Sequence, residues 1–373
     1  MTSADIEQVS NDNGRSHFRS QRVKISGRGL ATPAKALEPT RLFGTSGFDT
    51  SPFQFVEGFR TLDPEGLAEC MKSANALEEA NAKLRQQCAK GPPGAARLAF
   101  VNYRLGSPLQ WPKKAEVELL TDLAYANSDI VPIPIPDSPI ALSQIPRFRT
   151  YIGDAFTAIE RLNNKPVMGL LPTKMPREGI RSLLKWYGER GVNCFCVDFA
   201  GMMPDHLKVR SFTAQLAELE MLTGSLLYGI NARAGKFVKA ANAIPARDFF
   251  VYGLGLDVLG GSHKASMVPP AARGKRRRAS HRVFSAATYG YHKLETASQG
   301  LPIAGPFKPE TILSDPSGRV GRLYNMEAQR KESGALASRL GKLDKKGTIL
   351  SYVKQKALAV PELDHFRKER TLD

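Results

Sequence analysis

Short apolar segments alternate with longer helical patterns between residues 98 and 254, and this alternation restricts the fold more than any other feature of the chain. Each segment is apolar throughout, which is typical of strands buried on both faces of a parallel sheet. Because a helical pattern fills each interval, we expect an α/β protein whose parallel sheet is covered by helices. The apolar segments begin at Leu98, Ile130, Val167, Cys194, Leu226 and Phe249.

The number of these segments predicts how the sheet closes. Residues 41–43 and 283–286 could add two strands to the six above, and eight parallel strands with intervening helices form a (β/α)8 barrel of the TIM type. An open doubly wound sheet is the alternative. That fold commonly carries a Gly-x-Gly-x-x-Gly turn after an early strand, and the sequence has neither this turn nor a Gly-x-x-x-x-Gly-Lys-Ser/Thr loop. The sequence therefore predicts the barrel.

Composition divides the chain into three regions. Residues 1–21 are polar and lack periodicity, which predicts a disordered tail. Residues 22–300 are assigned to the (β/α)8 barrel domain. Residues 301–373 are too few for a second large core, so we expect a basic C-terminal helical appendage that docks on the barrel.

Apolar residues that recur at three- and four-residue intervals predict the helices. In the barrel they cover residues 64–89, 113–125, 146–161, 177–190 and 204–222, with a shorter segment at 235–243. In the appendage they cover residues 324–340 and 348–359.

The charge of the chain indicates a polyanionic partner. The sequence has 53 Lys and Arg against 36 Asp and Glu, a net charge of +17, and this excess favours nucleic acid. Part of the excess lies in one short stretch, which we assign to nucleic-acid contacts. A solvated basic loop is the alternative interpretation. The basic residues of the stretch are Arg273, Lys275, Arg276, Arg277, Arg278 and Arg282.

Several classes of protein receive no support from the sequence. Four cysteines are too few for a disulfide framework, and Cys194 and Cys196 lack a second Cys or His pair that would complete a metal site. No apolar run reaches the roughly 18 residues that a membrane-spanning helix needs. We expect a cytoplasmic protein without a metal, a cofactor or a membrane partner, and both a homodimer and a heterodimer are compatible with the sequence.

In a (β/α)8 barrel, functional side chains follow the carboxyl ends of the strands. Asp198 ends the apolar run 192–197, where partial desolvation suits a catalytic base or nucleophile. The alternative is a carboxylate that caps the next helix or pairs with Arg233. Asp137 and Asp257 are the other candidate catalytic carboxylates at such ends. The candidate binding residues are Asn231, Arg233, Tyr252, Gly253 and Gly255, and Asn102, Arg104 and Lys174 also follow strands.

Three motifs resemble, in order and spacing, the barrel of the tRNA-guanine transglycosylases, particularly the archaeal type. They are Ser-Asp-Ile-Val-Pro at residues 128–132, Phe-Val-Tyr-Gly-Leu-Gly at 250–255 and Phe-Ser-Ala-Ala-Thr-Tyr-Gly-Tyr at 284–291. Residues 27–34 also resemble the family's opening hairpin, so the resemblance covers about residues 22–295.

The resemblance implies a (β/α)8 barrel that exchanges a guanine in nucleic acid for a 7-deazaguanine, with tRNA the expected polymer and DNA the alternative. In that family an aspartate attacks the anomeric carbon of the ribose, and here its position is Ser285. The position of the family's base-recognising aspartate is Pro134, with Asp137 three residues later. The family's zinc site of three Cys and one His is missing, because no Cys follows Cys196.

Three functional hypotheses remain open at this point. The first is a transglycosylase-like enzyme that uses Asp198 with Asp137 or Asp257, contacts its substrate partly through Ser285, and holds nucleic acid with the basic stretch. The second is a catalytically silent relative, either a nucleic-acid-binding barrel or a partner subunit. The third is an unrelated TIM-barrel enzyme that acts on a small acidic or phosphorylated substrate.

Overall fold

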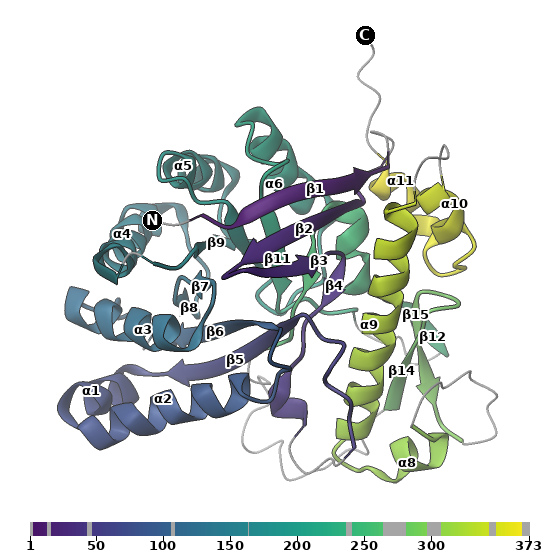
Figure 1. The fold of residues 1–373 in the computed structure, drawn as a ribbon, viewed down its shortest axis with the longest axis horizontal. Helices are drawn as coiled ribbons and strands as arrows, with labels where there is room; N and C mark the ends of the chain where they lie inside the picture. Colours follow the sequence, from purple (N-terminus) through teal and green to yellow (C-terminus); the bar gives the residue numbers. More distant parts are fainter. Residues whose placement is uncertain are drawn as a thin grey trace.

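The computed structural model describes residues 3–12, 16–42, 47–105, 109–162, 164–235, 241–263, 281–296, 307–342 and 348–367. The chain has a mixed α/β fold in which parallel strands lie inside a layer of helices (Figure 1). The largest sheet has six strands, and all of its neighbouring strands are parallel. Its order is β4 (Ala34–Lys35), β13 (Val258–Leu259), β11 (Leu226–Ile230), β10 (Cys194–Asp198), β9 (Val167–Pro172) and β7 (Val131–Pro132).

A second parallel sheet consists of β5 (Phe55–Leu62), β6 (Ala96–Tyr103) and β8 (Ile135–Pro136). Backbone hydrogen bonds connect it to the first sheet beyond the end of β4. The Leu37 amide donates to the Phe55 carbonyl oxygen at 2.8 Å, and the Glu57 amide donates to the Leu37 carbonyl oxygen at 3.1 Å. The strands are buried along nearly their whole length, which explains their continuous apolar sequence.

The helices cover the parallel strands from outside (Figure 1). In α5, for example, Ile180, Leu183, Leu184 and Tyr187 are buried while the opposite face is exposed, so the predicted periodicity is confirmed. The helices predicted at residues 113–125, 146–161, 177–190 and 204–222 are all present. The helices from α1 to α6 are α1 (Pro64–Lys72), α2 (Ala74–Cys88), α3 (Lys114–Asn127), α4 (Ile145–Leu162), α5 (Arg177–Gly188) and α6 (His206–Glu218).

The single helix predicted for residues 64–89 is two helices, because Ser73 interrupts it. Ser73 has an extended backbone, with φ −124° and ψ 114°, and its side chain accepts a hydrogen bond from the Ala76 amide at 3.3 Å. Ser73 therefore caps the amino end of α2, as Asp63 caps that of α1.

Replacing this cap gives a testable stability change. We expect Ser73→Ala to lower the free energy of unfolding by about 1 kcal/mol, since the Ala76 amide loses its side-chain acceptor. Chemical denaturation measures the change. Ser338→Ala is the matched control, because Ser338 lies exposed inside a helix, where alanine is no worse than serine. Equal stability of the two variants would contradict the role of the cap.

Two strands predicted for the parallel sheet were misplaced. Residues 249–254 form the 3-10 helix η3 (Phe249–Leu254), and the strand follows it as β13. Periodicity cannot separate a short buried strand from a short buried helix, and this run has only six residues. Residues 39–41 form the turn η1 (Pro39–Arg41), and the strand before it is β4.

Residues 283–286 also differ from the prediction. They belong largely to β14 (His281–Ser285), which pairs antiparallel with β15 (Gly290–Leu294). Together with β12 (Ala243–Pro245) these strands form a separate sheet. The helix predicted at residues 235–243 lies mostly outside the described residues, and its last residue begins β12.

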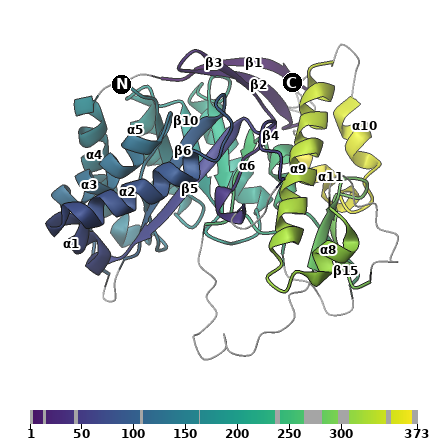
Figure 2. The same ribbon diagram turned by 60° about the horizontal axis from the view of Figure 1, so that its bottom comes forward.

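The prediction of a disordered tail over residues 1–21 is also wrong, because residues 5–11 form a strand. β1 (Asp5–Asn11), β2 (Arg19–Ile25) and β3 (Arg28–Ala31) make an antiparallel sheet. One face of this sheet is exposed, so its sequence is polar at alternate positions instead of apolar throughout. Figure 2 shows the sheet lying across one side of the parallel strands.

The contacts of this sheet place it at the amino ends of the parallel strands. The Ala4 amide donates to Asn193 Oδ1, just before β10, and Arg19 donates to the carbonyl oxygens of Leu222 and Ser225, just before β11. Arg19 also pairs with Asp257, directly before β13. The β1–β3 sheet therefore covers the amino ends and leaves the carboxyl ends to other segments.

The C-terminal region is helical, as predicted, but its longest helix is part of the main body. This helix, α9 (Arg319–Leu340), packs along β4 and β14, and its residues Leu336 and Leu340 belong to the main hydrophobic core. The shorter helices are α8 (Pro309–Ser314), α10 (Thr348–Lys354) and α11 (Leu363–Phe366). Among the described residues, no helix has the length and apolar character that crossing a membrane requires.

Candidate active site at the carboxyl ends of the parallel strands

Asp198 is the last residue of β10, and its carboxylate is held in a defined orientation. It is 5% exposed, and its Oδ1 accepts hydrogen bonds from the Ala200 amide and from Asn231 Nδ2, both at 2.8 Å. Ala200 and Asn231 have left-handed backbones, with φ of 53° and 58°. This conformation is uncommon for alanine and more readily adopted by asparagine, and non-glycine residues that adopt it occur often at functional sites. The loops after β10 and β11 are thus shaped around this carboxylate.

Asn231 connects Asp198 to the end of β13. Its side chain is fully buried and uses both of its polar atoms, since Nδ2 donates to Asp198 and Oδ1 accepts from the His263 amide at 2.7 Å. Its own amide donates to the Gly261 carbonyl oxygen at 2.9 Å. Asn231 therefore fixes the positions of the segments that follow three neighbouring strands, β10, β11 and β13.

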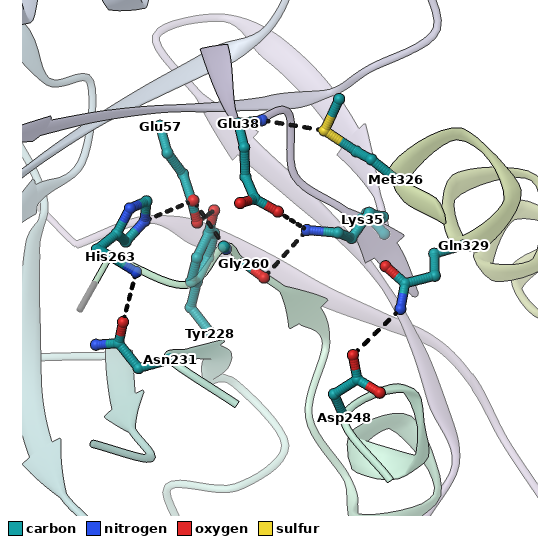
Figure 3. A network of polar contacts seen from close by, with 12 residues as sticks. Lys35, Glu38, Glu57, Tyr228, Asn231, Asp248, Gly260, His263, Met326 and Gln329 are labelled. Carbon is teal, nitrogen blue, oxygen red and sulfur yellow. Dashed lines mark hydrogen bonds and ion pairs between the residues drawn. The ribbon is translucent and has the colours of Figure 1, made fainter. Parts of the chain in front are cut away.

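Glu57 lies inside the protein in β5 and receives three hydrogen-bond donors (Figure 3). Tyr228 donates its hydroxyl to Oε1 at 2.6 Å, the Gly261 amide donates to Oε2 at 2.9 Å, and His263 Nε2 lies 2.8 Å from Oε2. Glu57 is 1% exposed. Burial, and then the negative charge of Glu57, raise the pKa of Tyr228 well above its usual value, so this phenol keeps its proton.

The ring of His263 packs against two aromatic side chains. It stacks on Phe59 at a centroid distance of 4.7 Å and on Phe100 at 5.6 Å. These contacts and the bond to Glu57 leave the ring little freedom to rotate. Hydrogen bonds thus join Asp198 through Asn231 to the backbone amide of His263, and the ring of the same histidine bonds to Glu57.

Gly260 is required where the chain passes this network. A Cβ atom at this position would lie 2.3 Å from Glu57 Oε1 and 2.7 Å from the Tyr228 ring, both far inside contact distance. The absence of a side chain at residue 260 therefore lets Glu57 and Tyr228 meet beside the backbone.

A cavity of about 160 Å³ lies beside the network, between the ends of β4 and β13 and the helix α9. Its wall includes Lys35, whose Nζ donates to Glu38 Oε1 at 3.0 Å and to the Gly260 carbonyl oxygen at 3.1 Å (Figure 3). Asp248 also lines it and accepts from the Tyr291 hydroxyl at 2.6 Å and from Gln329 Nε2 at 3.4 Å. Burial raises the pKa of Asp248. The cavity thus presents both a cation and a carboxyl group to a ligand.

Four of the residues predicted from the sequence lie near Asp198 or at the same edge. Asn231 contacts it directly, and Arg233 follows on the surface after β11. Asp137 follows β8, and its amide donates to the Tyr103 carbonyl oxygen at 2.8 Å. Asn102, at the end of β6, is buried. The carboxyl ends therefore bring Asp198, Asn231, Arg233 and Asp137 to one side of the molecule.

Asp257 lies at the opposite end, where it directly precedes β13. Its Oδ2 is 2.5 Å from Arg19 Nη2 and accepts from the Leu227 amide at 2.6 Å, and the carboxylate is fully buried. Burial raises its pKa to about 6 although Arg19 favours the charged form. The structure therefore separates Asp257 from Asp198 and gives it a contact with the β1–β3 sheet.

The predicted residues of the 3-10 helix η3 are also away from the carboxyl ends. Tyr252 donates its hydroxyl to the carbonyl oxygen of Ala34, the first residue of β4, at 2.7 Å. Gly253 packs against Phe366, where a Cβ would lie 2.5 Å from the ring, and Gly255 ends η3 with φ of 94°. These three residues hold packing and turn positions.

Ser285 and the basic stretch are the remaining site residues predicted from the sequence. Ser285 ends β14, outside both parallel sheets, and its carbonyl oxygen accepts from the Tyr289 amide in the turn to β15. Arg282 lies in β14, whereas Arg273, Lys275, Arg276, Arg277 and Arg278 lie outside the described residues. The part of the chain that the structure describes contains no cluster of three His, Cys, Asp or Glu residues suited to a metal ion.

Comparison with known proteins adds no assignment. No family model matches the chain, and no curated protein matches it.

Proposed function

We propose that the parallel strands close into one (β/α)8 barrel and that this barrel is a transglycosylase that exchanges a guanine base in nucleic acid. The barrel is supported by the continuous circuit of neighbours: β4 pairs with β13, Leu37 bridges to Val56 of β5, and β6 pairs with β8. The segment that contains β8 also contains β7, which pairs with β9. The helix α9 then covers β4, where a last barrel helix belongs.

The geometry of Asp198 is the observation that carries the proposed reaction. Both hydrogen bonds to its carboxylate reach Oδ1, so among the described contacts Oδ2 is the oxygen left for a substrate. A carboxylate held this way can attack the anomeric carbon of a nucleoside while the base departs with the electrons of the glycosidic bond. A second base then attacks the same carbon and displaces Asp198. Two such displacements retain the configuration of the sugar.

The net positive charge of the chain supports a nucleic-acid polymer as the substrate. A net charge of +17 draws polyanions, and the basic stretch that ends at Arg282 would hold a nucleic-acid backbone. The resemblance to tRNA-guanine transglycosylases makes tRNA the first polymer to test and DNA the second, with a 7-deazaguanine as the incoming base.

The direct test incubates the purified chain with bulk tRNA or duplex DNA and radiolabelled guanine, and counts label in acid-insoluble polymer. Incorporation is the expected result, and it also selects the polymer. Binding in a gel shift that weakens steeply with salt, without incorporation into either polymer, would instead identify a nucleic-acid-binding protein without this activity. If the chain binds neither polymer at low salt, the result would indicate a small acidic substrate.

A further inference from the structure

The donors around Glu57 determine which nitrogen of His263 carries a proton. Oε1 already accepts from Tyr228, and Oε2 accepts from the Gly261 amide. An ionised carboxylate can only accept hydrogen bonds, so His263 Nε2, 2.8 Å away, must be protonated to make its contact. Neutral His263 is therefore the Nε2–H tautomer, and its lone pair lies on Nδ1.

Nδ1 is the nitrogen that remains for chemistry. Glu57 holds Nε2 of the ring, and among the described residues Nδ1 makes no hydrogen bond. The ring is fixed by Phe59 and Phe100, so Nδ1 keeps a constant direction. A buried carboxylate that holds one ring nitrogen and leaves the other open is the arrangement that proton-transferring histidines require.

His263 and Asp198 are held by the same side chain. Asn231 Oδ1 accepts from the His263 amide, and Asn231 Nδ2 donates to Asp198 Oδ1. A substrate that reaches Oδ2 of Asp198 therefore approaches the backbone segment that carries His263.

We infer that His263 is the proton-transfer residue of this site, with Glu57 as its positioning residue, and this inference rests on the proposed base exchange. His263 enters this step as the imidazolium, with its Nε2–H held by Glu57 and a second proton on Nδ1. As Asp198 Oδ2 bonds to the anomeric carbon, the glycosidic C–N bond breaks and its electron pair stays on the base nitrogen, which takes the Nδ1 proton and leaves His263 neutral. Neutral His263 then accepts the N–H proton of the incoming base as that nitrogen attacks the sugar. The carboxylate of Asp198 leaves, and both residues return to their starting states.

The tautomer can be measured without any substrate. Nitrogen NMR of the full chain with ¹⁵N-labelled histidine, assigned with His263→Gln, should show neutral His263 protonated on Nε2. In Glu57→Gln the amide can donate to the ring, so the proton should move to Nδ1. Tyr228→Phe is the matched control, because it removes a different donor from Glu57 and should leave the tautomer unchanged. A wild-type ring protonated on Nδ1, or a tautomer insensitive to Glu57→Gln, would overturn the inference.

Base-exchange rates of His263 variants provide a second test of the inference. His263→Gln should slow base exchange about 10²–10⁴-fold with unchanged tRNA binding, and added imidazole should restore part of the rate in His263→Ala. His292→Gln, which changes a histidine outside the network, is the control. Wild-type exchange rates in His263→Gln would reject the role of His263 and leave the base exchange itself standing. If the wild-type chain exchanges no base, the proposed function fails, and the NMR experiment alone decides whether His263 has the required tautomer.

Discussion

Asp198→Asn is expected to reduce base exchange by at least about 10³-fold, because an amide cannot form the ester with the sugar that a carboxylate nucleophile forms. The carbonyl oxygen of the new side chain can still accept from the Ala200 amide and from Asn231. The fold and the affinity for nucleic acid should therefore stay as they are. Steady-state exchange rates and a gel shift on the same preparations measure the two quantities.

A covalent adduct gives this prediction a second readout. Wild-type protein denatured during turnover should retain labelled nucleic acid, and Asp198→Asn should retain none. Asp205→Asn is the matched control: Asp205 caps α6 on the surface, and asparagine caps helices equally well, so full activity is expected. Exchange at the wild-type rate in Asp198→Asn would remove this residue from the mechanism.

Arg19→Met should cause the largest loss of stability. It leaves the Asp257 carboxylate without its cation in a fully buried site, and breaking one side of such a pair costs about 3–5 kcal/mol. Denaturant unfolding measures the loss. Arg22→Met is the matched control from the same strand, because Arg22 pairs with Glu7 at 3.6 Å with both side chains more than half exposed. A change within about 0.5 kcal/mol is expected there. Equal stability of the two variants would contradict the buried pair.

The same pair predicts how stability depends on pH. The pKa of Asp257 is raised from 3.8 to about 6 in the folded protein by burial. Between these values the folded state holds a proton that the unfolded state has lost, so the contribution of Asp257 to stability decreases as pH rises from about 4 to about 6. Asp257→Asn should abolish this slope. An unchanged slope in that variant would assign it to other groups.

The sequence predicted the parts of the fold that long periodic segments determine. α5, for example, shows its buried face in the spacing of Ile180, Leu183 and Leu184. The sequence did not predict β13, because this strand pairs through only two residues and the more apolar run just before it resembles a strand. That error placed the expected strand end at Gly255 and not at Gly260. His263, which follows the true strand end, was therefore not considered as a candidate residue.

Part of the site could be predicted because continuous apolar runs locate the strand ends. Asp198 stands out because it ends a continuous apolar run, and Asn231 follows the next one. Glu57 lies inside a strand among Val56, Gly58 and Phe59, so nothing local indicates that its carboxylate meets Tyr228 and His263, which are 171 and 206 residues away in the chain. The Asp-Val-Leu-Gly-Gly sequence at residues 257–261 is the signal that could have located the end of β13.

The β1–β3 sheet at the amino ends has a consequence for how this chain can change over evolution. The ion pair between Arg19 and Asp257 connects the β1–β3 sheet to one end of the strands, whereas the loops after Asp198 and Asn231 shape the other. Substitutions that alter ligand preference can therefore accumulate in these loops while the far end preserves the fold. A scaffold divided in this way suits laboratory selection for new substrates, with diversity introduced at residues 199–204 and 232–235 alone.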